Sequence, residues 1–181
     1  MKDSITTYTK KQFTPLDPRE EDIDIRDIAH ALSLMTRANG HFPEFYSVGQ
    51  HSVACCQEAK ARGCSGRVVL AALLHDASEA YLADITRPVK KSLTVYLEAE
   101  RRVQEAVYRK YLGSLPTEEE SAQVKAVDDD CLYHEFFHFM GEKLWEEEPR
   151  VWHEQDLRVR PFAEVEKQFL ELFEELLVKS K

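Results

Sequence analysis

Hydrophobic residues recur three or four positions apart through most of the chain, and short polar breaks separate the periodic stretches. This spacing is typical of amphipathic helices. It predicts helices over residues 23–38, 47–62, 66–81, 92–112, 117–140 and 161–178. Only six glycines and seven prolines are present, which argues against a turn-rich all-β fold. We therefore expect an all-α fold, a compact single domain over residues 1–181 with about six helices.

The predicted helix ends carry recognisable capping residues. Ser65 is placed to cap the third helix, and Thr117 with Glu120 has the pattern of a capping box. Residues 1–22 predict an irregular lead-in, and residues 83–91 a loop. We expect residues 23–140 to form the helical core. The segment 150–181 ends in a helix whose apolar stripe packs on that core or on a dimer partner.

Composition narrows the class of protein. The net charge of −9 argues against a non-specific nucleic-acid binder, which normally has a basic surface. No apolar stretch approaches the ~20 residues that a membrane helix needs, and the first residues lack the apolar core of a signal peptide. We expect a cytoplasmic protein without a membrane partner. The four cysteines show no metal-binding spacing and are interpreted as reduced packing residues.

A His-Asp doublet, His75-Asp76, follows the apolar run 68–74. Burying two such side chains side by side is costly unless a partner compensates them, and a divalent metal is the natural partner. Imidazole with carboxylate suits Zn, Mn, Fe, Co or Ni without selecting one, and Mg is a further candidate. The doublet therefore predicts half of a metal site.

Further ligand-type residues lie on neighbouring predicted helices. His51 lies 24 residues before His75, and Asp128 lies 52 residues after Asp76, so each interval leaves room for a helix. Asp129 and Asp130 compete with Asp128, but the helical phase from Val124 favours Asp128. Two histidines and two carboxylates would leave open positions on an octahedral metal for water and a phosphate oxygen.

The order His, His-Asp, Asp on successive helices resembles the HD phosphohydrolase superfamily. From about Ile25 to Tyr133 the chain is most similar to its small bacterial and phage 5′-deoxyribonucleotidases. The segment 75–79, the acidic residue Asp84 five positions on, and Pro88-Val89-Lys90 follow the spacing of that family. The resemblance implies a single HD domain, often a homodimer, and a metal held by the four residues His51, His75, Asp76 and Asp128.

The resemblance also implies roles for residues around the metal. Glu79 would activate or orient the attacking water, and Asp84 would contact the sugar 3′-hydroxyl or the leaving oxygen. Arg37 would contact phosphate, with Arg87, Lys90 and His41 as further substrate-binding candidates. The family's Arg-Trp pair is Arg37-Ala38 here, and Gln50 replaces a Glu common before the first ligand. His41, Phe42 or Phe45 would have to supply the aromatic side chain, so the sugar preference stays open.

These expectations favour a metal-dependent phosphohydrolase that removes the 5′-phosphate from (deoxy)nucleoside monophosphates by attack of a metal-bound water. The alternative within the fold is a dNTP triphosphohydrolase, which needs more cations. Arg87, Lys90, Lys91, Arg101 and Arg102 are available for that purpose. A third hypothesis is a non-catalytic nucleotide-binding HD module, against which the retention of Glu79 and Asp84 argues.

A second motif points to a different reaction class. His134-Glu135-Phe136-Phe137-His138 matches the H-E-x-x-H pattern of zinc peptidases, with Glu135 as general base. The motif is short enough to occur by chance, and its third-ligand candidates, His153 and Glu154, lie beyond a Pro-broken acidic stretch. We set the peptidase aside. A role for Glu135 beside Asp128 remains open, because seven residues are about two helical turns.

Overall fold

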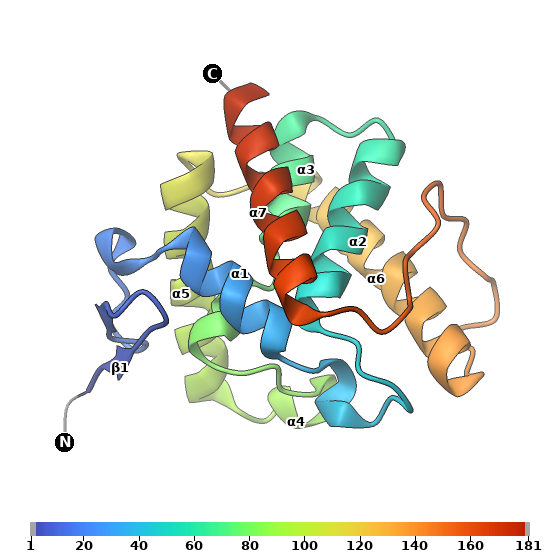
Figure 1. Cartoon of the computed structure of the whole chain (residues 1–181), viewed down its shortest axis with the longest axis horizontal. Helices are drawn as coiled ribbons and strands as arrows, with labels where there is room; N and C mark the ends of the chain where they lie inside the picture. The colour runs from blue at the N-terminus through green and yellow to red at the C-terminus, as the bar shows by residue number, and fades with distance from the viewer. Residues whose placement is uncertain (1–2, 180–181) are drawn as a thin grey trace.

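The computed structural model describes residues 3–179, and its regular secondary structure is almost entirely helical (Figure 1). Its helices are α1 (Ile25–Leu34), α2 (Val48–Ala61), α3 (Gly66–Leu73), α4 (Arg87–Lys90), α5 (Thr94–Leu112), α6 (Glu118–Met140) and α7 (Phe162–Lys179). Three 3₁₀ turns, η1 (Glu20–Asp22), η2 (Arg37–Gly40) and η3 (Ala77–Tyr81), connect them. The predicted all-α class is confirmed.

Two central helices, α2 and α3, form the middle of the hydrophobic core. Residues 68–73 of α3 are all buried, and α2 is buried along most of its length. Helix α7 packs on α1, α2 and α3, and α6 packs on α2 and α3 (Figure 1). Because the central helices are enclosed, polar side chains at their ends must find partners inside the protein.

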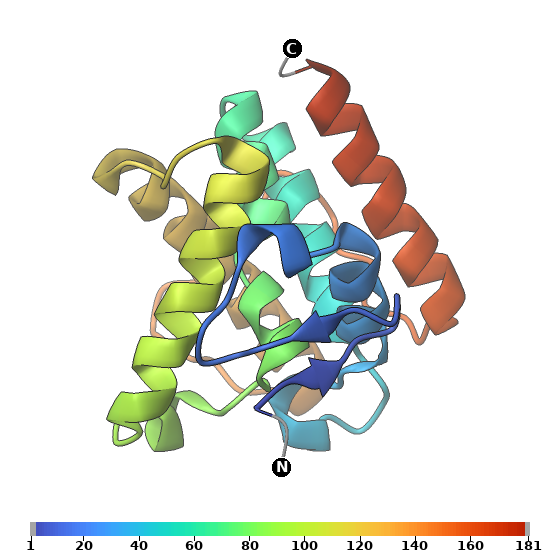
Figure 2. The ribbon, with the colours of Figure 1, turned by 90° about the vertical axis from the view of Figure 1, so that its left-hand side faces the viewer.

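The lead-in and the last helix complete the core from two sides. The lead-in contains a small hairpin of β1 (Ile5–Thr6) and β2 (Gln12–Phe13), seen on the outer face between α5 and α7 in Figure 2. Phe13 is fully buried and stacks on Tyr81 with 4.0 Å between ring centroids. Val165 and Phe169 of α7 are fully buried, so part of its apolar stripe packs on the core. No helix among residues 3–179 is long and apolar enough to cross a membrane.

The predicted caps are present. The Ser65 hydroxyl accepts a hydrogen bond from the Val68 amide, and Thr117 with Glu120 forms a capping box. A further capping box, Ser47 with Gln50, begins α2. These caps fix where α2, α3 and α6 start, and therefore fix the register of the side chains that they carry.

The third predicted helix is shorter than expected. It ends at Leu73 instead of Tyr81, and His75 and Asp76 lie in the turn before η3. Gln104 on α5 explains the early end: its amide nitrogen donates to the Leu74 carbonyl (2.8 Å), and its amide oxygen accepts from the Ser78 amide (3.1 Å). This distant side chain replaces the missing helical hydrogen bonds and turns the doublet out of the helix.

The first predicted helix also ends early, at Leu34 instead of Ala38. The backbone pairs Arg37 N with Tyr46 O (2.9 Å) and Val48 N with Met35 O (2.9 Å), which closes a loop. Ala38 adopts a left-handed φ of 52°, through which no helix continues. Arg37 is therefore held by the loop closure and not by a helix. The predicted loop 83–91 contains the short helix α4.

Close packing of α1 on α2 gives a first testable prediction. A Cβ at Gly49 would lie 3.1 Å from the backbone nitrogen and Cα of Ser33, whereas a Cβ at Gly66 would meet nothing within 4 Å. Overpacking costs about 1–3 kcal/mol, which outweighs the gain in helix propensity. We expect Gly49→Ala to be about 1 kcal/mol less stable in urea unfolding, and Gly66→Ala to be no less stable than the parent. Equal stability of both variants would contradict this.

Candidate metal centre

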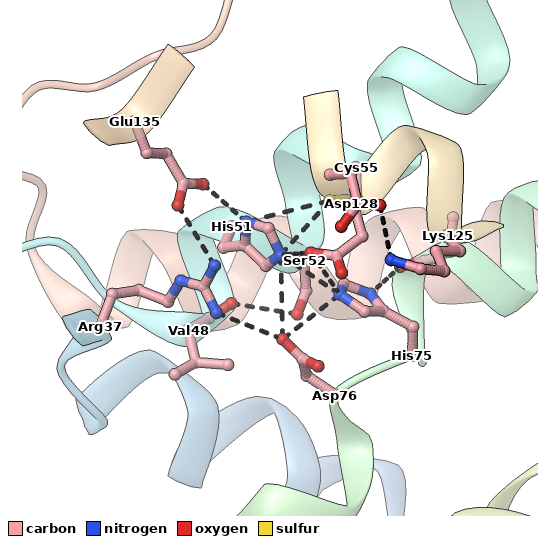
Figure 3. Close-up of polar contacts among 12 residues, drawn as sticks. Arg37, Val48, His51, Ser52, Cys55, His75, Asp76, Lys125, Asp128 and Glu135 are labelled. Atoms are coloured by element: carbon pink, nitrogen blue, oxygen red, sulfur yellow. Dashed lines mark hydrogen bonds and ion pairs between the residues drawn. The ribbon is translucent and has the colours of Figure 1, made fainter. Parts of the chain in front are cut away.

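The four predicted ligands come together where α2, α6 and the turn after α3 meet (Figure 3). His51 Nε2 lies 3.2 Å from His75 Nε2 and 3.1 Å from Asp128 Oδ1. Asp76 Oδ2 lies 3.3 Å from His75 Nε2. Atoms bound to one cation at 2.0–2.2 Å lie roughly 3–3.6 Å from each other, so these spacings match the edges of a coordination shell.

Hydrogen bonds on the far side of each imidazole fix which nitrogen faces the cluster. His51 Nδ1 donates to the buried carboxylate of Glu135 (2.6 Å), and His75 Nδ1 donates to the Ala72 carbonyl (2.7 Å). A neutral imidazole that donates from Nδ1 presents an unprotonated Nε2. Two such lone pairs facing each other at 3.2 Å repel unless a cation or a proton lies between them.

The charges in this cluster are strongly coupled. Burial and Arg37 lower the pKa of His51, but Glu135 and Asp128 outweigh both and raise it to about 9. Burial lowers the pKa of His75, and Asp76 and Asp128 raise it well above its usual value. Although burial opposes it, the two imidazoles hold the pKa of Asp76 and Asp128 below the usual range. The carboxylates thus require positive charge here, which protons or a divalent cation can supply.

Cys55 is a potential ligand that the sequence interpretation missed. Its Sγ lies 3.5 Å from His51 Nε2, and ligand atoms of His51, Cys55, His75 and Asp128 all lie within 4.8 Å of one another. The structure therefore contains a His-Cys-His-Asp group that could hold a metal ion. The spacing of four residues from His51 on one helix was the available signal. Burial and Cys131 raise the pKa of this thiol, which keeps it protonated without a metal.

Glu135, for which the sequence left a role beside Asp128 open, contacts two residues of the site. It is fully buried, and it accepts from His51 through Oε1 and from Arg37 Nη2 through Oε2 (3.3 Å). Arg37 Nη1 in turn lies 3.5 Å from Asp76 Oδ2 (Figure 3). Glu135 thus links a ligand histidine to the arginine beside a ligand aspartate.

The rest of the H-E-x-x-H motif does not converge on a metal site. His134 donates to the Pro149 carbonyl (2.8 Å), and His138 is exposed beside Phe139. Neither belongs to the group of possible metal ligands that residues 3–179 contain. The geometry gives no support to the zinc-peptidase alternative.

A cavity of about 660 Å³ opens beside the cluster. Its polar end contains two ligand carboxylates, two further acids and three cations: Asp76, Asp128, Glu79, Asp84, Arg37, Arg87 and Lys90. Its apolar lining residues are Phe42, Leu132, Phe136, Leu144 and Trp145, together with Ala38, Ile85 and Pro88. Leu132 and Phe136 follow Asp128 by about one and two turns of α6, so we call the first five of these residues the apolar end of the cavity. His41 is exposed and is not among the lining residues, and Phe45 is exposed too. Of the three aromatic candidates, only Phe42 lines the cavity.

The two acids beside the cluster hold their protons more tightly than usual. Glu79 is only 4% exposed, and its Oε2 has no hydrogen-bond partner within residues 3–179. Burial, with the charges of Asp76 and Asp84, raises the pKa of Glu79 to about 10. Burial also raises the pKa of Asp84. An unpartnered carboxyl oxygen at a cavity wall is costly, so this atom is suited to bind a water or a substrate oxygen.

The three cations of the cavity are already paired with acids. Arg87 Nη2 donates to Asp128 (3.1 Å) and contacts Asp129, Lys90 pairs with Glu100, and Arg37 pairs with Glu135 and Asp76. Lys91, Arg101 and Arg102 do not line this cavity. The free positive charge that a ligand meets there is therefore small, apart from a bound metal.

Comparison with known proteins finds relatives without an established activity. The chain is 38% identical over 107 residues to the uncharacterized protein YfdR of Escherichia coli, a match that covers 59% of this chain and 57% of YfdR. It is 42% identical over 102 residues to the uncharacterized protein RCAP_rcc00048 of Rhodobacter capsulatus, covering 53% of this chain and 52% of that protein. The chain thus matches little more than half the length of these relatives. No protein-family model matches it.

Proposed function

We propose that the protein is a metal-dependent phosphohydrolase that removes the 5′-phosphate from nucleoside monophosphates. The observation that carries the proposal is the pair of facing Nε2 atoms of His51 and His75, flanked by two aspartates that line a cavity. His51, His75, Asp76 and Asp128 would hold the metal. The same cavity contains Glu79, Asp84 and Arg37, which suit the other tasks of phosphoryl transfer to water.

We assign one group to each step of the hydrolysis: activation of water, binding of the phosphate and protonation of the leaving oxygen. A divalent cation bound by the four ligands would supply Lewis-acid charge, lower the pKa of water and offset the acids that raise the pKa of Glu79. Glu79 would orient the attacking water with its unpartnered oxygen and take its proton. Arg37, held in place by Glu135, would bind the phosphate. Asp84, whose raised pKa favours the protonated form, would give a proton to the departing 5′-oxygen.

The charge around the cavity favours a monophosphate over a triphosphate. A nucleoside triphosphate brings about four negative charges, and Arg37, Arg87 and Lys90 are all paired with acids already. The cations that the triphosphohydrolase alternative also requires, Lys91, Arg101 and Arg102, lie outside the cavity lining. A dianionic phosphate that meets the metal demands less compensation.

Product analysis tests the proposal. Purified full-length protein is incubated with deoxy- and ribonucleoside mono- and triphosphates, with Mn, Co, Zn or Mg added in turn, and products are separated by ion exchange. We expect inorganic phosphate and nucleoside from monophosphates. Intact triphosphate as product would replace the proposal with triphosphohydrolase activity. Metal binding without turnover of either class would favour the non-catalytic nucleotide-binding module.

Glu79→Gln separates chemistry from metal binding. Because Glu79 makes no hydrogen bond to the predicted ligands, we expect the variant to keep its metal, as measured by elemental analysis. Loss of the base should lower kcat by about 100-fold or more. Ser78→Ala, a change at a buried neighbouring residue, is the control and should keep kcat within about two-fold. Full activity of Glu79→Gln would remove Glu79 from the mechanism.

A further inference from the structure

The segment between α6 and α7, residues 141–161 (the strap), contains neither helix nor strand. It is seen at the right edge of Figure 1. Ordered connections longer than about 12–15 residues are uncommon, and those that occur are mostly functional. A functional role is therefore expected for the strap.

Buried polar groups fasten the strap to the helical core. Glu58 on α2 is fully buried and accepts from the backbone amides of Trp152 (2.9 Å) and His153 (2.8 Å). Arg62 donates to the same carboxylate (2.7 Å), and its guanidinium lies 5.0 Å from the centre of the Trp152 ring. Two further hydrogen bonds, from Gln50 to the Arg158 carbonyl and from His134 to the Pro149 carbonyl, hold other points. The strap is therefore held against the helical core by several hydrogen bonds, and its first part forms one wall of the cavity described above.

The first part of the strap faces the cavity. Leu144 and Trp145 line its apolar end together with Phe42 and Phe136. The centroid of the Trp145 ring lies 5.3 Å from that of the Tyr133 ring, and the ring centroids of Phe42 and Phe136 lie 5.2 Å apart. An apolar, aromatic surface thus lines the same cavity as the metal ligands and continues from Asp128 along α6.

We propose that this aromatic end binds the base of the nucleotide by stacking, with Trp145 as the principal contact. The inference rests on the proposed function for the phosphate end alone. A ligand with an anionic group at one end and a flat π-system at the other matches both ends of the cavity. Among the side chains of the apolar end, only Trp145 carries a hydrogen-bonding group, its indole N–H, so little is available there to read base edges. The protein therefore requires a base but tolerates different ones.

The chain offers a built-in probe, because Trp145 and Trp152 are its two tryptophans. In a Trp152→Phe, Glu79→Gln protein loaded with Mn or Co, Trp145 is the sole indole, and hydrolysis of the ligand is slowed by about 100-fold or more. We expect deoxyadenosine 5′-monophosphate to change Trp145 fluorescence with saturation. 2-Deoxyribose 5-phosphate, the same ligand without a base, should bind at least about five-fold more weakly, as measured by calorimetry.

Substitution at the wall completes the test. In the same Glu79→Gln background, Trp145→Ala should bind the nucleotide and the sugar phosphate with nearly equal affinity. Trp145→Phe should keep most of the difference, since it keeps a π-face. Circular dichroism verifies that both variants fold. Deoxyguanosine, deoxycytidine and thymidine monophosphates should fall within about ten-fold of one another.

Two results would overturn the inference: equal affinity for nucleotide and sugar phosphate in the parent, or an unchanged preference for the nucleotide in Trp145→Ala. These failures differ from failure of the proposed function. Base-dependent binding without hydrolysis of any ester would remove the hydrolase and keep the base site. Equal hydrolysis of nucleotide and sugar phosphate would keep the hydrolase and remove the base site.

Discussion

Asp76→Asn is expected to weaken divalent-metal binding by about 100-fold or more and to abolish turnover, whereas Cys55→Ser should keep both within about three-fold. The side chains of Asp76 and Cys55 both lie near the His51 and His75 nitrogens. Comparing the two variants therefore shows which of these side chains binds the metal. Asp76 carries a negative charge in the metal-free cluster, and it lines the cavity where a substrate must meet the metal. Losing even an indirect partner of a metal costs 10–100-fold in affinity, and a direct ligand costs more.

Cys55 has different surroundings. It is buried one helical turn from His51 with its neighbour Cys131, its thiol is held protonated, and it does not line the cavity. Metal content after dialysis, and Kd from competition with a chelator, measure both variants. The reverse result, with metal lost in Cys55→Ser and kept in Asp76→Asn, would establish a His-Cys-His-Asp site and remove Asp76 from the ligand set.

The sequence was sufficient to predict the six longer helices and the approach of four side chains to one another. Apolar periodicity located the six longer helices, since each contributes buried apolar residues to a common core. His51, His75, Asp76 and Asp128 do converge, although 77 residues separate the first from the last. Caps such as Ser65 and Thr117 act within a single turn, so they could be recognised from neighbouring residues alone.

Features fixed by distant side chains could not be predicted in this way. The sequence predicts a helix over residues 66–81, but Gln104 from α5 bonds the backbone at Leu74 and Ser78, and the helix ends at Leu73 with His75-Asp76 in the turn that follows. Nothing local marks Glu58 as the fastening point of a segment some ninety residues away. Glu135 belongs to a sequence motif of zinc peptidases, whereas in the structure it accepts from His51 on α2 and from Arg37.

Glu135→Ala should be the most destabilising change at the site outside the ligands. Both partners of Glu135 lose a buried counter-charge, although Arg37 keeps Asp76 and His51 keeps Asp128: His51 is fully buried, and the side chain of Arg37 is 11% exposed. Removing one member of a buried ion pair costs about 3–5 kcal/mol. We expect a loss of this size in urea unfolding of the metal-free protein. In the metal-loaded protein, affinity should fall about 10–100-fold because His51 Nδ1 loses the acceptor that fixes its tautomer.

A series at this position distinguishes orientation from packing. Glu135→Gln keeps the shape and an oxygen that can accept from His51 Nδ1, so its metal affinity should lie between those of the parent and Glu135→Ala. Nitrogen-15 chemical shifts of the His51 ring report the tautomer directly and should change only in Glu135→Ala. A purely structural role would lower stability while leaving the tautomer and the metal affinity of the folded fraction unchanged.

His138→Ala is the matched control, because His138 belongs to the same H-E-x-x-H motif but is exposed. A zinc peptidase would need both histidines of the motif as ligands, whereas the His51 cluster needs neither. We expect His138→Ala to keep its metal and to change stability by no more than about 0.5 kcal/mol. Loss of metal in His138→Ala, with metal kept in Glu135→Ala, would show that the H-E-x-x-H motif binds the metal and the His51 cluster does not. In that case Glu135 would act on a peptide instead of orienting His51.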